Sequence, residues 1–132
     1  MIYGKLSLED WCNLSIEGEV PESSFENHNL RLFFYGTLYN RDVLQANFDD
    51  TNAKLVASIY LQDGESGFSL LDGSFTIVFY SKEQCGIVRD HHGTHFPVYY
   101  AKSGEFATSL TFFSEHFGIP CQLDKSSLSC FL

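Results

Sequence analysis

Short runs of apolar, aromatic and β-branched residues alternate with turn residues along most of the chain, a pattern typical of strands. These runs predict strands at residues 2–6, 30–34, 74–80, 85–90, 98–102 and 105–109. The last four runs follow one another closely, so they predict an antiparallel meander. Residues 18–29 are polar and include Pro21, Ser23 and Ser24, which predicts a surface loop.

Three other segments carry a helical pattern. Residues 42–48 place Asp42 near the positive end of a helix, and residues 52–61 repeat apolar side chains at helical spacing before Gly64. Residues 123–132 predict a short helix that opens near Asp124. A few helices among many strands predict an α+β fold.

Length and composition narrow the class of protein. The 132 residues predict a single domain, and 44% hydrophobic with 16% aromatic residues can form a packed core, which excludes an intrinsically disordered chain. The net charge is −9, because acidic residues outnumber Lys and Arg. Such a chain lacks the clustered positive charge that nucleic acid or an anionic membrane surface requires, so we expect neither as a partner.

The chain also lacks the marks of membrane insertion and secretion. No run approaches the roughly 18 consecutive apolar residues of a membrane span, and the first residues do not follow a basic segment with an apolar one. The four cysteines, Cys12, Cys85, Cys121 and Cys130, are scattered and predict reduced thiols. We therefore expect a cytoplasmic protein.

Several residues after position 70 are typical of tight structural turns. Asp72-Gly73 and Gly93 mark positions where the chain is expected to turn with an unusual φ, and Pro97 favours an extended approach to a strand. Arg89 and Asp90 at a strand end are suited to bridge neighbouring loops by charge-assisted hydrogen bonds. These features predict a scaffold rather than an activity.

The same region holds a histidine cluster. Three imidazoles, at His91, His92 and His95, lie beside Asp90 and are chemically suited to Zn²⁺. The segment reads as a turn between strands, however, and no matching pair of ligands occurs elsewhere. We therefore expect a solvated loop, with neither a metal nor another cofactor.

Four motifs occur in the order of a known family. They are residues 35–40 (Y-G-T-L-Y-N), 72–75 (D-G-S-F), 89–100 (R-D-H-H-G, then P-V-Y-Y) and 104–109 (G-E-F-A-T-S). Together they resemble the glutaminase domain of class II glutamine amidotransferases, in the asparagine synthetase branch. The resemblance implies an N-terminal-hydrolase-type sandwich of packed antiparallel sheets with flanking helices, here reduced in size.

The resemblance also implies which residues glutamine hydrolysis would need. The family uses an N-terminal cysteine as nucleophile, where this chain has Ile2, and Cys12 lies farther inside the chain. The family's oxyanion hole combines an Asn side chain with a Gly N–H, where Tyr35 and Gly36 stand here. Asn52 stands near the place of an Asp that binds the substrate amine. The expected domain is therefore a degenerate, inactive glutaminase.

In intact relatives the glutaminase domain precedes an ATP-dependent synthetase domain. Residues 123–132 resemble the connector to that domain, but the chain carries no nucleotide-binding signature. We therefore expect a scaffolding role toward a synthetase-type domain or subunit that forms amides or lactams, or self-association.

Two other functions remain open. The string Tyr35-Gly36-Thr37-Leu38 also resembles the strand-ending motif of gamma-glutamylcyclotransferase-like enzymes, which need a catalytic Glu. The candidates for that role are Glu65, Glu83 and Glu105. The second alternative is a module that binds a small ligand through the Gly36 N–H and an emptied pocket.

Overall fold

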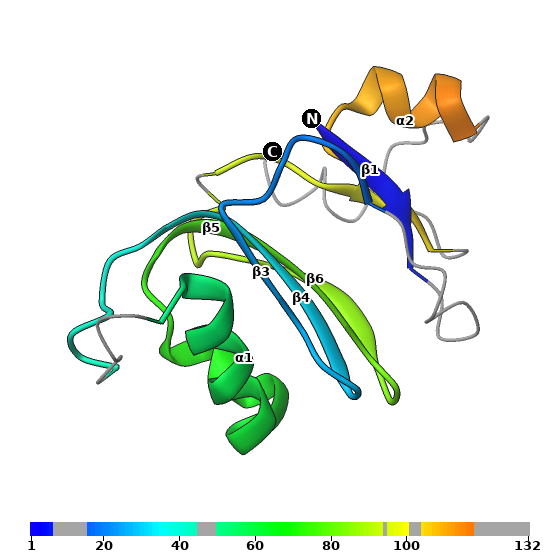
Figure 1. Ribbon diagram of the computed structural model, residues 1–132. Coiled ribbons are helices and arrows are strands. Elements are labelled where there is room, and N and C mark those ends of the chain that lie inside the picture. The colour runs from blue at the N-terminus through cyan, green and yellow to red at the C-terminus, as the bar shows by residue number, and fades with distance from the viewer. Residues whose placement is uncertain (7–15, 45–49, 94, 101–103, 118–132) are drawn as a thin grey trace.

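The computed structural model describes residues 1–6, 16–44, 50–93, 95–100 and 104–117. These ranges form two four-stranded antiparallel sheets, two α-helices and one 3-10 helix (Figure 1). The elements are β1 (Ile2–Lys5), β2 (Ile16–Gly18), β3 (Ser23–Glu26), β4 (Leu30–Leu38), α1 (Asn52–Asp63), η2 (Gly64–Leu70), β5 (Gly73–Ser81), β6 (Cys85–Arg89), β7 (Tyr99–Tyr100), β8 (Glu105–Ala107) and α2 (Leu110–Phe117).

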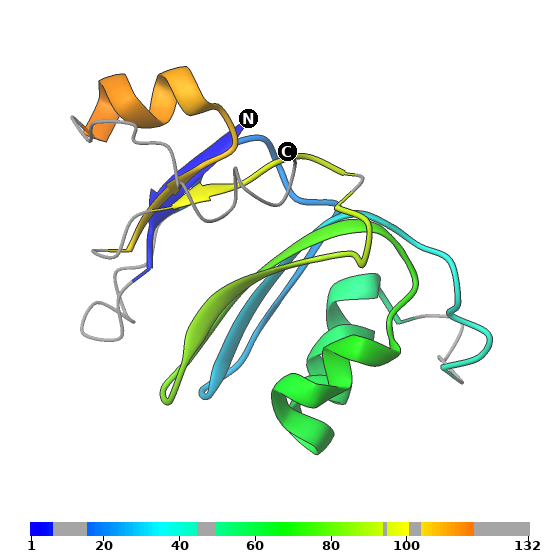
Figure 2. The same ribbon diagram turned by 180° about the vertical axis from the view of Figure 1, so that it is seen from behind.

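The elements stack in four layers. One sheet has the strand order β3-β4-β5-β6, and α1 covers one of its faces. The other face packs against the second sheet, whose order is β2-β1-β8-β7, and α2 lies beyond that sheet (Figures 1 and 2). The α+β class is therefore confirmed, with two packed antiparallel sheets between outer helices.

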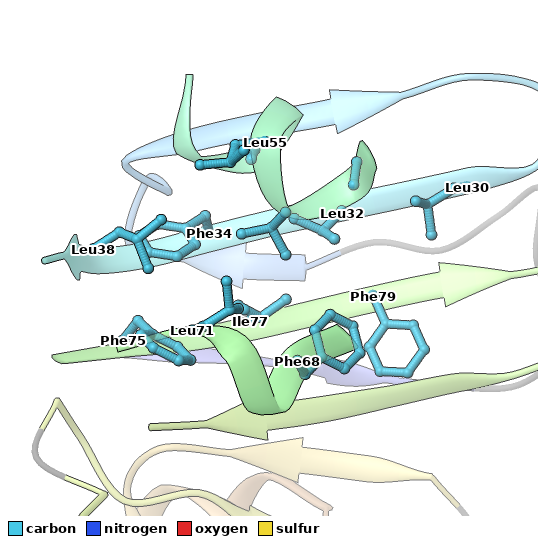
Figure 3. Close-up of a cluster of buried hydrophobic side chains, with 13 residues drawn as sticks. Leu30, Leu32, Phe34, Leu38, Leu55, Phe68, Leu71, Phe75, Ile77 and Phe79 are labelled. Atoms are coloured by element: carbon cyan, nitrogen blue, oxygen red, sulfur yellow. The ribbon is translucent and has the colours of Figure 1, made fainter. Parts of the chain in front are cut away.

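The longest strands, β4 and β5, organise both cores. They pair along nine residues, from Leu30 opposite Ser81 to Leu38 opposite Gly73. Because side chains alternate across a strand, every second residue faces α1 and the others face the second sheet. The side chains toward α1 form a buried apolar core, drawn in Figure 3. Its larger members are Leu30, Leu32, Phe34, Leu38, Leu55, Phe68, Leu71, Phe75, Ile77 and Phe79.

The predicted helix at residues 52–61 is present as α1, and its ends have clear causes. The Thr51 hydroxyl accepts a hydrogen bond from the Lys54 N–H at 3.2 Å and so caps the helix N-terminus. Gly64 ends the helix, as predicted, and its N–H donates to the Tyr60 carbonyl. Leu55 and Val56 on the predicted apolar face are buried.

Two sequence-based predictions about strands are wrong. Part of the predicted loop 18–29 is β3, a strand at the edge of the sheet that pairs with β4. Its half-buried residues, Ser23 and Phe25, alternate with the exposed Ser24 and Glu26, as is typical of a strand at a sheet edge. The meander is also divided, because β4, β5 and β6 pair in sequence whereas β7 and β8 join the second sheet beside β1.

The predictions for the other helices have different outcomes. Residues 41–44 form a turn in which the Leu44 N–H donates to the Asn40 carbonyl, and the rest of the predicted helix 42–48 lies outside the described residues. The predicted helix 123–132 lies outside them as well. Sequence analysis missed α2, because its aromatic residues resemble a strand as much as a helix. No helix in the described ranges is both long and apolar enough to cross a membrane.

Truncation of a core side chain tests the layer under α1. We expect Leu32→Ala to lower the free energy of unfolding by about 2–5 kcal/mol, because Leu32 is fully buried and its loss leaves a cavity. Urea denaturation measures the change. Leu61→Ala removes the same side chain from an exposed position of α1; this control should shift stability by less than about 0.5 kcal/mol. Equal losses in the two variants would contradict the assigned packing.

Candidate functional site

The candidate site is the apolar interlayer cluster, which we define as Ile2, Tyr35, Val78 and Phe106 between the two sheets. Ile2 in β1 is 1% exposed, and its N–H donates to the Thr108 hydroxyl at 3.0 Å. The Ile2 carbonyl accepts from the Thr108 N–H at the same distance, so both backbone groups of Ile2 are fixed. The fold thus brings Ile2 and Tyr35 into one cluster, although 32 residues lie between them in the sequence.

Tyr35 fills the β4 side of this cluster. Its side chain is 3% exposed, and its ring packs edge-on against Phe96 with centroids 6.0 Å apart. Burial, and secondarily the negative charge of Glu19, raises the pKa of Tyr35 to about 12. The phenol is therefore neutral at physiological pH.

Sequence analysis missed the residue opposite Tyr35. Thr76 in β5 is the cross-strand partner of Tyr35, and the shared register turns both side chains toward the second sheet. The buried Thr76 Oγ1 has no hydrogen-bond partner among the described residues. The sequence does contain a signal for Thr76. It is a polar residue within the apolar run of β5, and its side chain points to the same face of the sheet as Tyr35.

Gly36 has a structural role beside Tyr35. Its φ is +114°, and a Cβ at this position would lie 2.2 Å from the Ser74 carbonyl oxygen. Only glycine permits the close approach of β4 and β5 here. Gly36 also lies within the paired part of β4, opposite Phe75, and not in a turn beyond the strand.

Asn52 lies on the other side of the sheet from Tyr35. As the first residue of α1 it accepts a hydrogen bond from the Arg41 guanidinium, and its amide donates to the Glu22 carboxylate at 3.2 Å. Because α1 covers the face of β4 that points away from the second sheet, Asn52 and Tyr35 do not form one site.

Arg89, Asp90 and Gly93 organise the loop after β6. The Asp90 side chain is buried, and its two carboxylate oxygens accept the N–H groups of Phe75 and His92, each at 3.1 Å. The Arg89 guanidinium donates to the Gly93 carbonyl at 2.8 Å. These bonds join the end of β6 to the beginning of β5 and give the loop a fixed shape.

The other motif residues lie at chain junctions. Gly93 has the expected positive φ, whereas Gly73 does not; a Cβ on Gly73 would lie 2.2 Å from the Thr37 carbonyl oxygen, so close strand approach requires it. Asp72 is exposed beside the end of β4, and the exposed Pro97 precedes β7. Within the described residues, no three His, Cys, Asp or Glu side chains form a group that could hold a metal.

The three glutamates considered for cyclotransferase chemistry lie in different parts of the fold. Glu65 is exposed in η2, and Glu83 is exposed in the β5–β6 turn, at the opposite end of β5 from the partner of Gly36. Glu105 in β8 lies 3.9 Å from the Lys5 ammonium. The Tyr-Gly-Thr-Leu string ends β4 at Leu38 but is paired with β5 over its whole length.

A cleft of about 380 Å³ is lined by residues of β6, β7 and β8 together with Leu6; its lining includes Cys85, Ile87, Tyr100 and Phe106. Burial raises the pKa of the Cys85 thiol, which disfavours the reactive thiolate at neutral pH.

Comparison with known proteins defines the class. A family model described as a glutamine amidotransferase domain matches residues 10–132, so the chain belongs to the glutamine amidotransferase domain family. β1 and Ile2 precede the matched region. A search of curated proteins and a search of solved structures found no match.

Alkaline titration tests the environment of Tyr35. The raised pKa means that the neutral phenol stabilises the fold fully below pH 10, and that this contribution is lost as the pH rises through about 12. We expect the difference in phenolate absorbance between the native chain and Tyr35→Phe to have its midpoint near pH 12. The exposed Tyr39→Phe variant controls for the loss of one phenol. A midpoint near pH 10 would contradict the buried placement of Tyr35.

Proposed function

We propose that this chain is a non-catalytic glutaminase-like domain with a scaffolding or partner-binding role. The system we propose for it is of the asparagine synthetase type, an ATP-dependent machinery that forms amides or lactams. The observation that carries the proposal is the packing of Ile2 and Tyr35 in one apolar cluster. Membership in the glutamine amidotransferase family supplies the context.

The chemistry of glutamine hydrolysis explains why this packing matters. Attack on the amide needs a nucleophile such as a thiolate, together with hydrogen-bond donors for the oxyanion that forms. Ile2 provides a saturated hydrocarbon side chain that is 1% exposed, and Tyr35 provides a ring packed on Phe96. These residues favour adhesion between the sheets over binding of a polar substrate.

The layered arrangement supports the proposed N-terminal-hydrolase type. Two antiparallel sheets pack face to face with helices outside, and β1 contributes its first residue to the space between the sheets. The asparagine synthetase branch is favoured by the ordered motifs after residue 70. The loop held by Arg89 and Asp90 belongs to these motifs, and three hydrogen bonds of these two side chains shape it.

The retained scaffold also favours a partner-binding role. The hydrogen bonds that shape the Asp90 loop and the β4–β5 junction hold surfaces of the domain in place. They would do so whether or not glutamine is hydrolysed. A cytoplasmic location is part of the proposal and agrees with the free thiol of Cys85.

An activity assay tests the non-catalytic role. We expect the purified chain to release glutamate from glutamine at the uncatalysed rate, because no thiol occupies position 2. Ile2→Cys should stay near background, since Tyr35 supplies no amide donor and the loss of one such donor costs about 10²–10³-fold. Glutamate release that disappears in Cys12→Ser or Cys85→Ser would overturn the proposal.

Affinity purification tests the partner. We expect the tagged chain to retain a synthetase-type protein that adenylates a carboxylate, detected by mass spectrometry and by substrate-dependent release of pyrophosphate from ATP. Sedimentation of the purified chain tests the alternative of self-association. The tag alone is the control. A chain that retains no adenylating protein and sediments as a monomer would contradict the partner-binding role.

A further inference from the structure

A second cleft, of about 360 Å³, lies where the C-terminal end of α1 meets two turns of the sheet β3-β4-β5-β6. These turns join β3 to β4 and β5 to β6, and they lie at the same end of the sheet (Figures 1 and 2). Asn29 lines the cleft from the first turn, Lys82 and Glu83 from the second, and Tyr60 and Leu61 from α1. We call it the turn cleft.

Hydrogen bonds and ring packing fix the wall of the turn cleft. The Gln84 side-chain amide donates to the Tyr60 hydroxyl at 2.9 Å, and the Ser81 N–H donates to the Gln84 carbonyl at 2.8 Å. The Tyr60 ring stacks on Phe68 with centroids 5.5 Å apart. The polar groups of this wall are therefore held in place before a ligand arrives, which reduces the entropic cost of binding.

The Tyr60 hydroxyl has a hydrogen to offer a ligand. Its nearest oxygen neighbour is Ser81 Oγ, at 3.3 Å. Ser81 Oγ already donates to the Gln84 carbonyl and accepts the N–H groups of Glu83 and Gln84. A serine hydroxyl has one hydrogen and two lone pairs, so these three bonds use its whole capacity. An oxygen atom of a ligand would therefore be a better acceptor for the Tyr60 hydrogen than Ser81 is.

The charged lining of the turn cleft narrows the class of ligand. Lys82 and Glu83 are both exposed, and among the described residues neither forms an ion pair. A ligand with only a negative charge would meet Glu83, and a ligand with only a positive charge would meet Lys82. A molecule that carries both an ammonium and a carboxylate group can pair with each of them.

We propose that the turn cleft binds a free amino acid with an apolar side chain. The carboxylate accepts the Tyr60 hydrogen and pairs with Lys82, the ammonium group pairs with Glu83, and the side chain covers Leu61, which is 51% exposed. The volume is near the lower end of the roughly 300–1,000 Å³ of small-molecule pockets, which suits a ligand of this size. The inference goes beyond the partner-binding role, because the turn cleft lies at the opposite end of β4 and β5 from Gly36.

Three matched probes test the proposal. They are L-leucine, 4-methylpentanoate, which lacks the ammonium group, and 3-methylbutylammonium, which lacks the carboxylate. Each is titrated into the isotope-labelled full chain, and backbone amide shifts are followed by NMR. We expect saturable shifts at Asn29, Leu61 and Lys82 with leucine. Each analogue should bind about fivefold more weakly than leucine or worse, because it loses one exposed charge pair.

Variants of the lining residues assign each charge of the ligand to its partner. Lys82→Gln should weaken leucine and 4-methylpentanoate about fivefold but not 3-methylbutylammonium, and Glu83→Gln should weaken leucine and the amine but not the carboxylate. Tyr60→Phe should weaken only the two carboxylate-bearing probes. Lys5→Gln, which removes an exposed ammonium from β1, is the matched control and should leave all three affinities unchanged. Absence of saturable shifts with leucine, equal binding of the three probes, or equal effects of Lys82→Gln and Lys5→Gln would overturn the proposal.

Discussion

The pairing of β4 with β5 is the constraint on which the rest of the structure depends. Both strands are nine residues long, paired from end to end and covered on both faces. A shift of one residue in this register would turn Leu32 and Phe34 away from α1 and bring their neighbours into that core. Burial on two faces therefore fixes the register and, with it, the position of α1 on one side and of the second sheet on the other.

The same register determines what stands at the candidate site. When Phe34 faces α1, Tyr35 must face the second sheet, where Ile2 and Phe106 meet it. An enzyme would need reactive, partly solvated groups at this place, whereas packing of the sheets favours apolar ones. In this chain the position beside β1 is occupied by residues that increase burial, and glycine at position 36 preserves the close strand contact. The residues that provide adhesion between the sheets are thus the same ones on which the proposed non-catalytic role rests.

Polar groups divide between those that hold the fold and those that face solvent. The Asp90 carboxylate is buried and accepts two backbone N–H groups, so it replaces bonds that the loop after β6 cannot make for itself. Asn40 acts similarly between the end of β4 and the beginning of β5. The side chains of Asp42 and Asp72, in contrast, are exposed.

Local sequence patterns were sufficient to predict α1 and β5. Periodicity and the cap residues Thr51 and Gly64 defined α1, and the apolar run before Tyr80 defined β5. Tertiary structure alone decided that β3 is a strand, because an edge strand gains its bonds from β4 and three of the four residues of β3 are polar. It also decided that β7 and β8 leave the meander to pair near β1, since pairing between distant segments has no local signature. For the same reason, the sequence could identify Tyr35, Gly36 and Asn52 as candidate residues but could not place them in space. Packing alone showed that Asn52 lies apart from the other two. Strand pairing alone placed Thr76 beside Tyr35.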